Sequence, residues 1–109
     1  MMQRPSERRA EQRVDVDLSG TLTFGETSCV CSIRNICRRG FLFEAMTGLP
    51  RGQVVQLAVH LYPDTLINCT VEIKHVNAQR LGAMVLEMAD HDRVVCQQFM
   101  AEQRALRSR

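Results

Sequence analysis

The stretch VDVDLSGTLTF, residues 14–24, decides the fold, because apolar side chains occupy most of its even positions. A two-residue period is typical of a β-strand with one buried face. The turn signal Gly25-Glu26-Thr27 follows, and the apolar phase then moves to odd positions over residues 29–33. We therefore predict a hairpin in which paired residue numbers sum to about 52. This register places Arg13 opposite Arg39, to within a couple of residues.

The rest of the chain continues as short alternating segments separated by turns, and then changes period. Gly20 is the expected kink or bulge of the first strand. Further strands are predicted over residues 41–43, 55–61, 67–75 and 81–88. The last of these is apolar enough to be buried on both faces. Asp90 is the expected N-cap of a terminal helix. The apolar face of that helix comprises Val95, Phe99 and Leu106, with Cys96 and Met100 beside them.

Six strands followed by one helix predict an all-β fold with one helix, namely a six-stranded antiparallel β-barrel capped by a C-terminal α-helix. The 109 residues are enough for one hydrophobic core. No apolar run approaches the ~20 residues of a membrane span, and no signal-peptide core is present. We therefore expect a cytoplasmic protein without a membrane span.

The charge distribution is more informative than the net charge of +2. Thirteen of the fourteen cationic side chains are arginine, and ten of these gather at residues 4–13, 34–39 and 104–109. A few focused anion contacts fit this distribution better than a long phosphate track, so no nucleic-acid partner is expected. The five cysteines and three histidines lack the spacing of a disulfide scaffold or a zinc site. No catalytic arrangement is evident, so we expect neither an enzyme, nor a metal, nor a cofactor.

Two arginine clusters are the candidate binding residues. The guanidinium group is a planar fork of donors that fits two phosphate oxygens or the O6 and N7 atoms of guanine. The hairpin register brings both clusters to one end of the sheet. Strand alternation prevents all members of the second cluster from facing one ligand. The first cluster is Arg8, Arg9 and Arg13, and the second is Arg34, Arg38 and Arg39.

The pattern Arg9-x-x-x-Arg13, followed by Asn35-x-Cys37-x-x-Gly40, resembles the RxxxR and D/N-x-S-x-x-G signature of the PilZ domain family. The resemblance extends from about residue 7 to residue 100 and includes the turn at Leu81-Gly82. It implies a PilZ-type barrel with its helix over residues 14–109, preceded by a flexible arm, residues 1–13, that carries RxxxR. It also implies binding of the bacterial second messenger cyclic di-GMP.

The same resemblance implies a role for each matched residue. Arg9 and Arg13 grip the guanine and phosphate groups, and Arg8 contacts the second molecule of an intercalated ligand dimer. Asn35 accepts a hydrogen bond from a guanine N–H. Gly40 lets the backbone turn and approach the ligand without a side chain in the way.

Three further residues complete the expected ligand site. His75, near the end of the fifth strand, either stacks on guanine or is satisfied locally at the barrel rim. Arg39 is the candidate from the second arginine cluster. Cys37 stands where the family pattern has serine, and a thiol is a weak donor and acceptor. A hydrogen bond of ~0.5–1.5 kcal/mol is therefore weakened at this position.

Two functions are compatible with these residues. The first is a receptor domain that binds cyclic di-GMP, orders its arm and changes the surface offered to an unidentified effector protein. The alternative is a PilZ-like interaction module that binds no nucleotide and acts in pilus, motility or envelope machinery. Intact arginines and Gly40 favour the first, whereas Cys37 favours the second.

Overall fold

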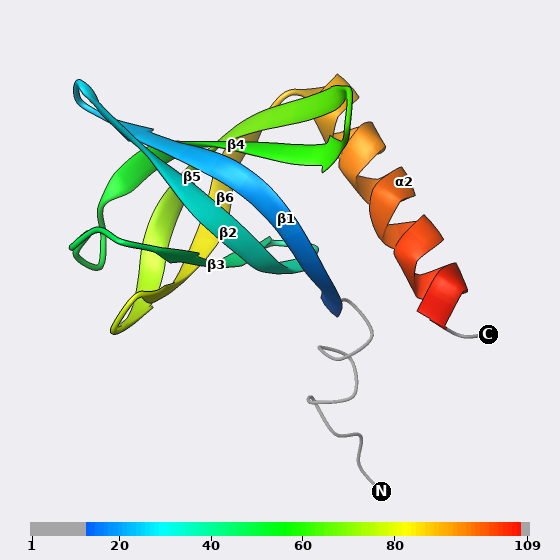
Figure 1. Ribbon diagram of the computed structural model, residues 1–109. Helices are drawn as coiled ribbons and strands as arrows, with labels where there is room; N and C mark the ends of the chain where they lie inside the picture. Colours follow the sequence, from blue (N-terminus) through cyan, green and yellow to red (C-terminus); the bar gives the residue numbers. More distant parts are fainter. Residues whose placement is uncertain (1–12, 108–109) are drawn as a thin grey trace, which may run out of the picture.

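The computed structural model describes residues 13–107, which form one closed barrel and one helix (Figure 1). All neighbouring strands are antiparallel, in the order β1-β2-β3-β6-β5-β4, and β4 closes the ring on β1. The predicted six-stranded barrel with a C-terminal helix is confirmed. The elements are β1 (Arg13–Phe24), β2 (Thr27–Cys37), β3 (Gly40–Ala45), β4 (Val54–Tyr62), β5 (Thr65–Asn77), β6 (Arg80–Met88) and α2 (Asp90–Arg107).

The β1–β2 hairpin turns at Gly25, whose φ of 60° is readily adopted by glycine. Arg13 pairs with Cys37, two residues from the predicted partner, so the register prediction is confirmed within its stated margin. The expected bulge at Gly20 is wrong, because the register shifts between Asp15 and Leu18 instead. Gly20 has a different reason to be glycine. A Cβ there would lie 2.7 Å from the carbonyl oxygen of Ala58, where β1 and β4 approach closely.

The core fills the barrel with inward-facing aliphatic side chains and Phe43. In β6, Leu81 and Ala83 are buried, whereas Leu86 is 47% exposed and Glu87 is exposed. The expectation that this strand is buried on both faces is therefore wrong, because nothing within residues 13–107 covers its outer face near Leu86. The fully buried residues of largest volume are Phe43, Leu22, Ile33, Ile36, Leu57, Ile67, Ile73 and Leu81.

The helix α2 packs beside the first half of β1, where no pairing of β1 with β4 is recorded (Figure 1). The recorded pairing between β1 and β4 covers residues 20–23 of β1. Phe99 of α2 lies next to the earlier part of β1. The rings of Phe99 and Tyr62 meet edge to face with centroids 5.4 Å apart. Tyr62 also donates a hydrogen bond to the Glu102 carboxylate, and Arg107 donates to the backbone oxygen of Asp15.

The start and the apolar face of α2 differ in detail from the predictions. The backbone oxygen of Ala89 accepts the first helical hydrogen bond, from Arg93 at 2.9 Å, so Ala89 and not Asp90 occupies the N-cap position. Leu106 is 60% exposed and does not belong to the buried face of the helix, whose buried residues are Cys96, Phe99 and Met100. No helix within residues 13–107 is both long and apolar enough to cross a membrane.

Candidate ligand-binding face

The strand register arranges the motif residues on the outer face of the barrel. A row of buried side chains runs across five strands, and its members point into the core. Because side chains alternate along a strand, the rows on either side of this one face outward. The buried row is Val14, Ile36, Phe41, Ala83 and Ile73.

Two outward rows, called row one and row two, flank the buried row. Each is a chain of directly paired residues that crosses β1, β2, β3, β6 and β5. Row one consists of Arg13, Cys37, Gly40, Met84 and Glu72. Row two consists of Asp15, Asn35, Leu42, Gly82 and His75. Five of the predicted ligand-binding residues thus lie in two adjacent rows, although Arg13 and His75 belong to strands at opposite ends of them.

Asn35 is the buried polar residue of this face, with 8% of its surface exposed. Its side-chain Nδ2 donates a hydrogen bond of 2.8 Å to Oδ1 of Asp15, the residue paired with it on β1. Among the described residues, no buried side-chain nitrogen or oxygen atom lacks a partner. The amide oxygen of Asn35, for which no bond is recorded, is therefore accessible from outside. Asp15 fixes the orientation of the amide so that an acceptor is presented.

Sequence reasoning did not identify Asp15 as a functional residue. The signal was present, since the predicted hairpin register places the residue two positions after Arg13 close to Asn35. Hydrophobic alternation assigns Asp15 to the outer face, but it does not indicate which polar atoms bond to each other.

Gly40 is glycine for a reason other than the expected turn. It is the first residue of β3 and its φ is outside the positive region, so the turn itself is made by Arg38 and Arg39. A Cβ on Gly40 would lie 1.9 Å from the backbone oxygen of Ala83 on β6. The absence of a side chain is therefore required by the approach of β3 to β6. It also leaves row one without a side chain at its centre.

His75 is exposed, and its ring lies over Gly82, the residue paired with it on β6. A Cβ on Gly82 would meet ring atom Cδ2 of His75 at 3.3 Å. The glycine thus gives the imidazole a flat surface to rest on. The ring thus contacts the sheet at Gly82, and no hydrogen bond to another described residue is recorded for it.

The arginines of the two clusters have different surroundings. Arg8 and Arg9 lie outside the described residues. Arg34 is held by two carboxylates, 3.2 Å from Asp17 and 3.3 Å from Glu44. A hydrogen bond from Arg80, aided by Arg34, lowers the pKa of the Glu44 carboxyl. Arg34 is therefore largely neutralised on the surface.

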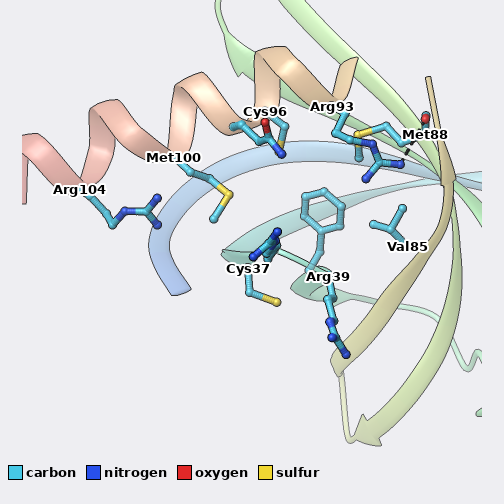
Figure 2. Close-up of a pocket in the computed structure, with 11 residues that line it drawn as sticks. Cys37, Arg39, Val85, Met88, Arg93, Cys96, Met100 and Arg104 are labelled. Atoms are coloured by element: carbon cyan, nitrogen blue, oxygen red, sulfur yellow. Dashed lines mark hydrogen bonds between the residues drawn. The ribbon is translucent and has the colours of Figure 1, made fainter. Parts of the chain in front are cut away.

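Arg38 and Arg39 belong to a different region, a cavity of about 740 Å³ between the β2–β3 turn and α2 (Figure 2). Cys37 also lines this cavity, and Figure 2 shows its sulfur and the Arg39 side chain directed away from the helix. Cys37 is half-buried and therefore belongs to both row one and the cavity wall. The register brings Arg13 and Cys37 together but does not bring Arg39 into either row.

Three of the other cysteines, Cys31, Cys69 and Cys96, are buried. Burial raises the pKa of Cys31 and Cys69 to about 12 and that of Cys96 to about 11, so these thiols stay protonated at neutral pH. Within residues 13–107, no three His, Cys, Asp or Glu side chains gather as a metal-binding group would.

Comparisons with known proteins agree with this architecture. The family model of the PilZ domain matches residues 7–102. Comparison with curated protein sequences gives no significant match. Among solved structures, the chain is similar to the Bacillus subtilis inhibitor of motility MotI/DgrA, with a TM-score of 0.77 and 18% identity, over 90% of this chain and 51% of that one. It is also similar to the uncharacterized Legionella protein Lpg0364, with a TM-score of 0.56 and 13% identity, over 89% of this chain and 98% of that one.

The two structural likenesses concern the fold, and the chain spans about half the length of MotI/DgrA. The family match is of a different kind, because it rests on sequence and extends over most of the 109 residues. The chain therefore belongs to the PilZ domain family, a family of cyclic di-GMP receptors that act as binding and adaptor modules rather than enzymes.

Proposed function

We propose that this chain is a cyclic di-GMP receptor domain that binds its ligand on the outer face formed by row one and row two. The observation that carries the proposal is the register, which aligns Arg13 with Cys37 and Gly40, and Asn35 with His75 at the other end of row two. A cationic fork, a fixed amide acceptor, a flat strip of backbone and an exposed ring suit a ligand with two phosphates and two guanines.

Arg9 and Arg13 supply the guanidinium groups that bind phosphate and the O6/N7 edge of guanine. Arg8 contacts the second ligand molecule of an intercalated cyclic di-GMP dimer. Gly40 leaves space for the ligand at the centre of row one, and His75 stacks on a guanine ring. Binding orders the arm, residues 1–13, against the barrel and changes the surface presented to an effector protein.

Asp15 gives the site a carboxylate in the absence of the family's aspartate. Asn35 is neutral, so by itself it offers guanine a weaker acceptor than a carboxylate. Asp15 accepts from Asn35 through Oδ1 and keeps Oδ2 as a second acceptor beside it. We assign Asp15 two roles, the orientation of the Asn35 amide and a charge-assisted hydrogen bond to a guanine N–H.

Calorimetric titration with cyclic di-GMP tests the proposal. Arg13→Ala removes a bidentate contact of ~1–3 kcal/mol, so the affinity falls about tenfold or more. Asp15→Ala weakens binding more than Asp15→Asn, which keeps an acceptor for Asn35. Arg51→Ala is the matched control, because Arg51 is an exposed arginine in the loop before β4, outside both rows. Absence of binding by the wild-type protein at high-micromolar ligand refutes the proposal.

Cys37→Ser restores the stronger donor and acceptor of the family pattern and leaves the volume almost unchanged. The affinity for cyclic di-GMP is expected to stay equal or to rise by up to about tenfold, equivalent to ~0.5–1.5 kcal/mol. Clearly weaker binding by Cys37→Ser contradicts the role of position 37 as a ligand contact.

The second candidate is an interaction module that binds no nucleotide, and it is favoured by Cys37 in place of serine. Its structural neighbour MotI/DgrA is an inhibitor of motility, so the corresponding partner here is a component of pilus, motility or envelope machinery. The calorimetric experiment separates the two candidates. If wild type and Cys37→Ser both give no heat, the interaction module is the remaining function.

A further inference from the structure

The cavity between α2 and the β2–β3 turn forms a groove with an apolar floor (Figure 2). It is called the α2 groove below and has a volume of about 740 Å³. Apart from Cys37 it shares no residue with row one or row two. Its apolar floor is made by Phe41, Val85, Met88, Cys96 and Met100.

One face of α2 forms the length of the groove. The helical residues that line it recur at spacings of three and four, as expected for a single stripe. Arg93 and Arg104 lie at the two ends of this stripe, with Cys96, Gln97 and Met100 between them. Eleven residues at ~1.5 Å per residue separate the two arginines by about 16 Å along the helix axis.

The groove is strongly cationic. Arg38 and Arg39 line its opposite wall, although the Arg39 side chain is directed away from the helix, and no acidic residue is among the described residues that line the groove. Within residues 13–107, no ion pair is recorded for Arg38, Arg39 or Arg93. Arg93 donates to the backbone oxygen of Met88 at 3.4 Å and keeps its charge uncompensated. By contrast, Arg34 on the barrel surface is matched by two carboxylates.

We infer that the α2 groove binds an acidic segment of a partner protein whose apolar side chains enter the floor. Among the described residues, cations without a recorded ion pair lie on both walls of the groove, Arg38 on one and Arg93 on the other, so they match carboxylates spaced along a chain. A fatty acid has a single carboxylate, which pairs with one of these two cations and leaves the other unmatched. Methionine side chains adapt to different apolar partners, and arginine and methionine are enriched at protein interfaces.

This inference goes beyond nucleotide binding and does not depend on it, because Cys37 is the only described groove residue that belongs to row one or row two. Six methionines allow the two sites to be observed separately by NMR with 13C-methyl labels. Met88 and Met100 report on the groove, and Met84 in row one reports on the nucleotide face. Met46, which is 81% exposed, reports on unspecific contact.

The probes are three capped hexapeptides and decanoate. DELFED carries acidic ends and an apolar centre, KKLFKK reverses the charges, and DESGED lacks the apolar centre. We expect DELFED to shift the Met88 and Met100 methyls saturably, with a dissociation constant of about 1 mM or below. KKLFKK, DESGED and decanoate bind at least about tenfold more weakly, because KKLFKK lacks acidic groups, DESGED lacks the apolar centre and decanoate has a single carboxylate. Met46 and Met84 do not move.

Charge reversal locates the binding. Arg38 and Arg93 are exposed, so Arg38→Glu and Arg93→Glu leave the fold intact. Each substitution lowers the affinity for DELFED at least about tenfold. Arg51→Glu, the matched control, leaves DELFED binding unchanged. The inference is overturned if DELFED does not shift Met88 and Met100, if a control probe binds equally well, or if Arg51→Glu has the same effect as Arg93→Glu. Titration with cyclic di-GMP, followed at Met84, tests the receptor function independently.

Discussion

Gly40→Ala separates the folding role of this motif residue from its ligand role. The added Cβ would lie 1.9 Å from the Ala83 oxygen, 3.0 Å from the Ala83 carbonyl carbon and 3.1 Å from the Met84 Cα atom. All three are backbone atoms of β6, so no side chain can rotate to relieve the contact. Ordinary van der Waals contact begins at about 3.4 Å, and β3 must therefore move about 1.5 Å away from β6 at this point.

A displacement of this size breaks backbone hydrogen bonds. Two bonds of ~0.5–1.5 kcal/mol each are affected, including that from the Val85 amide to the Arg39 oxygen at 2.8 Å. Overpacking adds ~1–3 kcal/mol. We expect Gly40→Ala to lower the free energy of unfolding by about 4 kcal/mol, a large share of the ~5–15 kcal/mol typical of a domain.

Urea unfolding followed by circular dichroism measures this loss. Gly48→Ala is the matched control, because a Cβ there has no atom within 4 Å and the φ of Gly48 is not positive. Its stability changes by less than about 1 kcal/mol. A Gly40→Ala midpoint equal to that of wild type refutes the packing argument. If the expected loss is found, failure of this variant to bind ligand says nothing about a ligand contact at Gly40.

Four other experiments test the packing of the barrel and its helix. Gly82→Ala meets only the movable ring of His75 at 3.3 Å, so urea unfolding shows a change below about 1 kcal/mol. Tyr62→Phe keeps the ring contact and loses the bond to Glu102, and thermal unfolding shows destabilisation of at most about 1.5 kcal/mol; a larger loss contradicts this assignment. Burial raises the pKa of three thiols to about 11 or 12. Their contribution to the free energy of unfolding is therefore fully present below pH 9 and is lost as the pH rises through 11 to 12, which thermal melts will record. At pH 8 a thiol reagent reacts quickly with two of the five cysteines of the native protein, and five equal rates contradict the burial of Cys31, Cys69 and Cys96.

The fold was predictable because its signals are local. Alternation in residues 14–24 and the turn at Gly25 fix the phase of the hairpin, and from them the register followed to within two residues. The helix prediction was wrong at Leu106, because periodicity alone does not show which apolar positions of a helix contact the barrel. The prediction that the sixth strand is buried on both faces was wrong at Leu86 for a related reason. The burial of an apolar side chain depends on a covering layer, which periodicity does not report.

The candidate site was less predictable, because it depends on contacts between distant residues. Gly40 is glycine because of Ala83, a residue on β6 that pairs with the neighbour of Gly40. The bond between Asp15 and Asn35 requires the register of β1 and β2 to be known without error. The placement of Arg39 in the α2 groove depends on the twist of the β2–β3 turn and on the path of a helix more than fifty residues later.

The first half of β1 is hydrogen-bonded to β2 on one side, and among the described residues β4 joins its other side only from Gly20 onward. An unpaired strand edge is a template for a strand from another molecule. Here α2 occupies that side, with Arg107 on the backbone oxygen of Asp15 and Phe99 against Tyr62. The helix therefore covers this edge of β1 and prevents it from pairing with a strand of another molecule. A protein whose helix is detached becomes prone to swapped dimers and aggregation, and its state of association then depends on concentration.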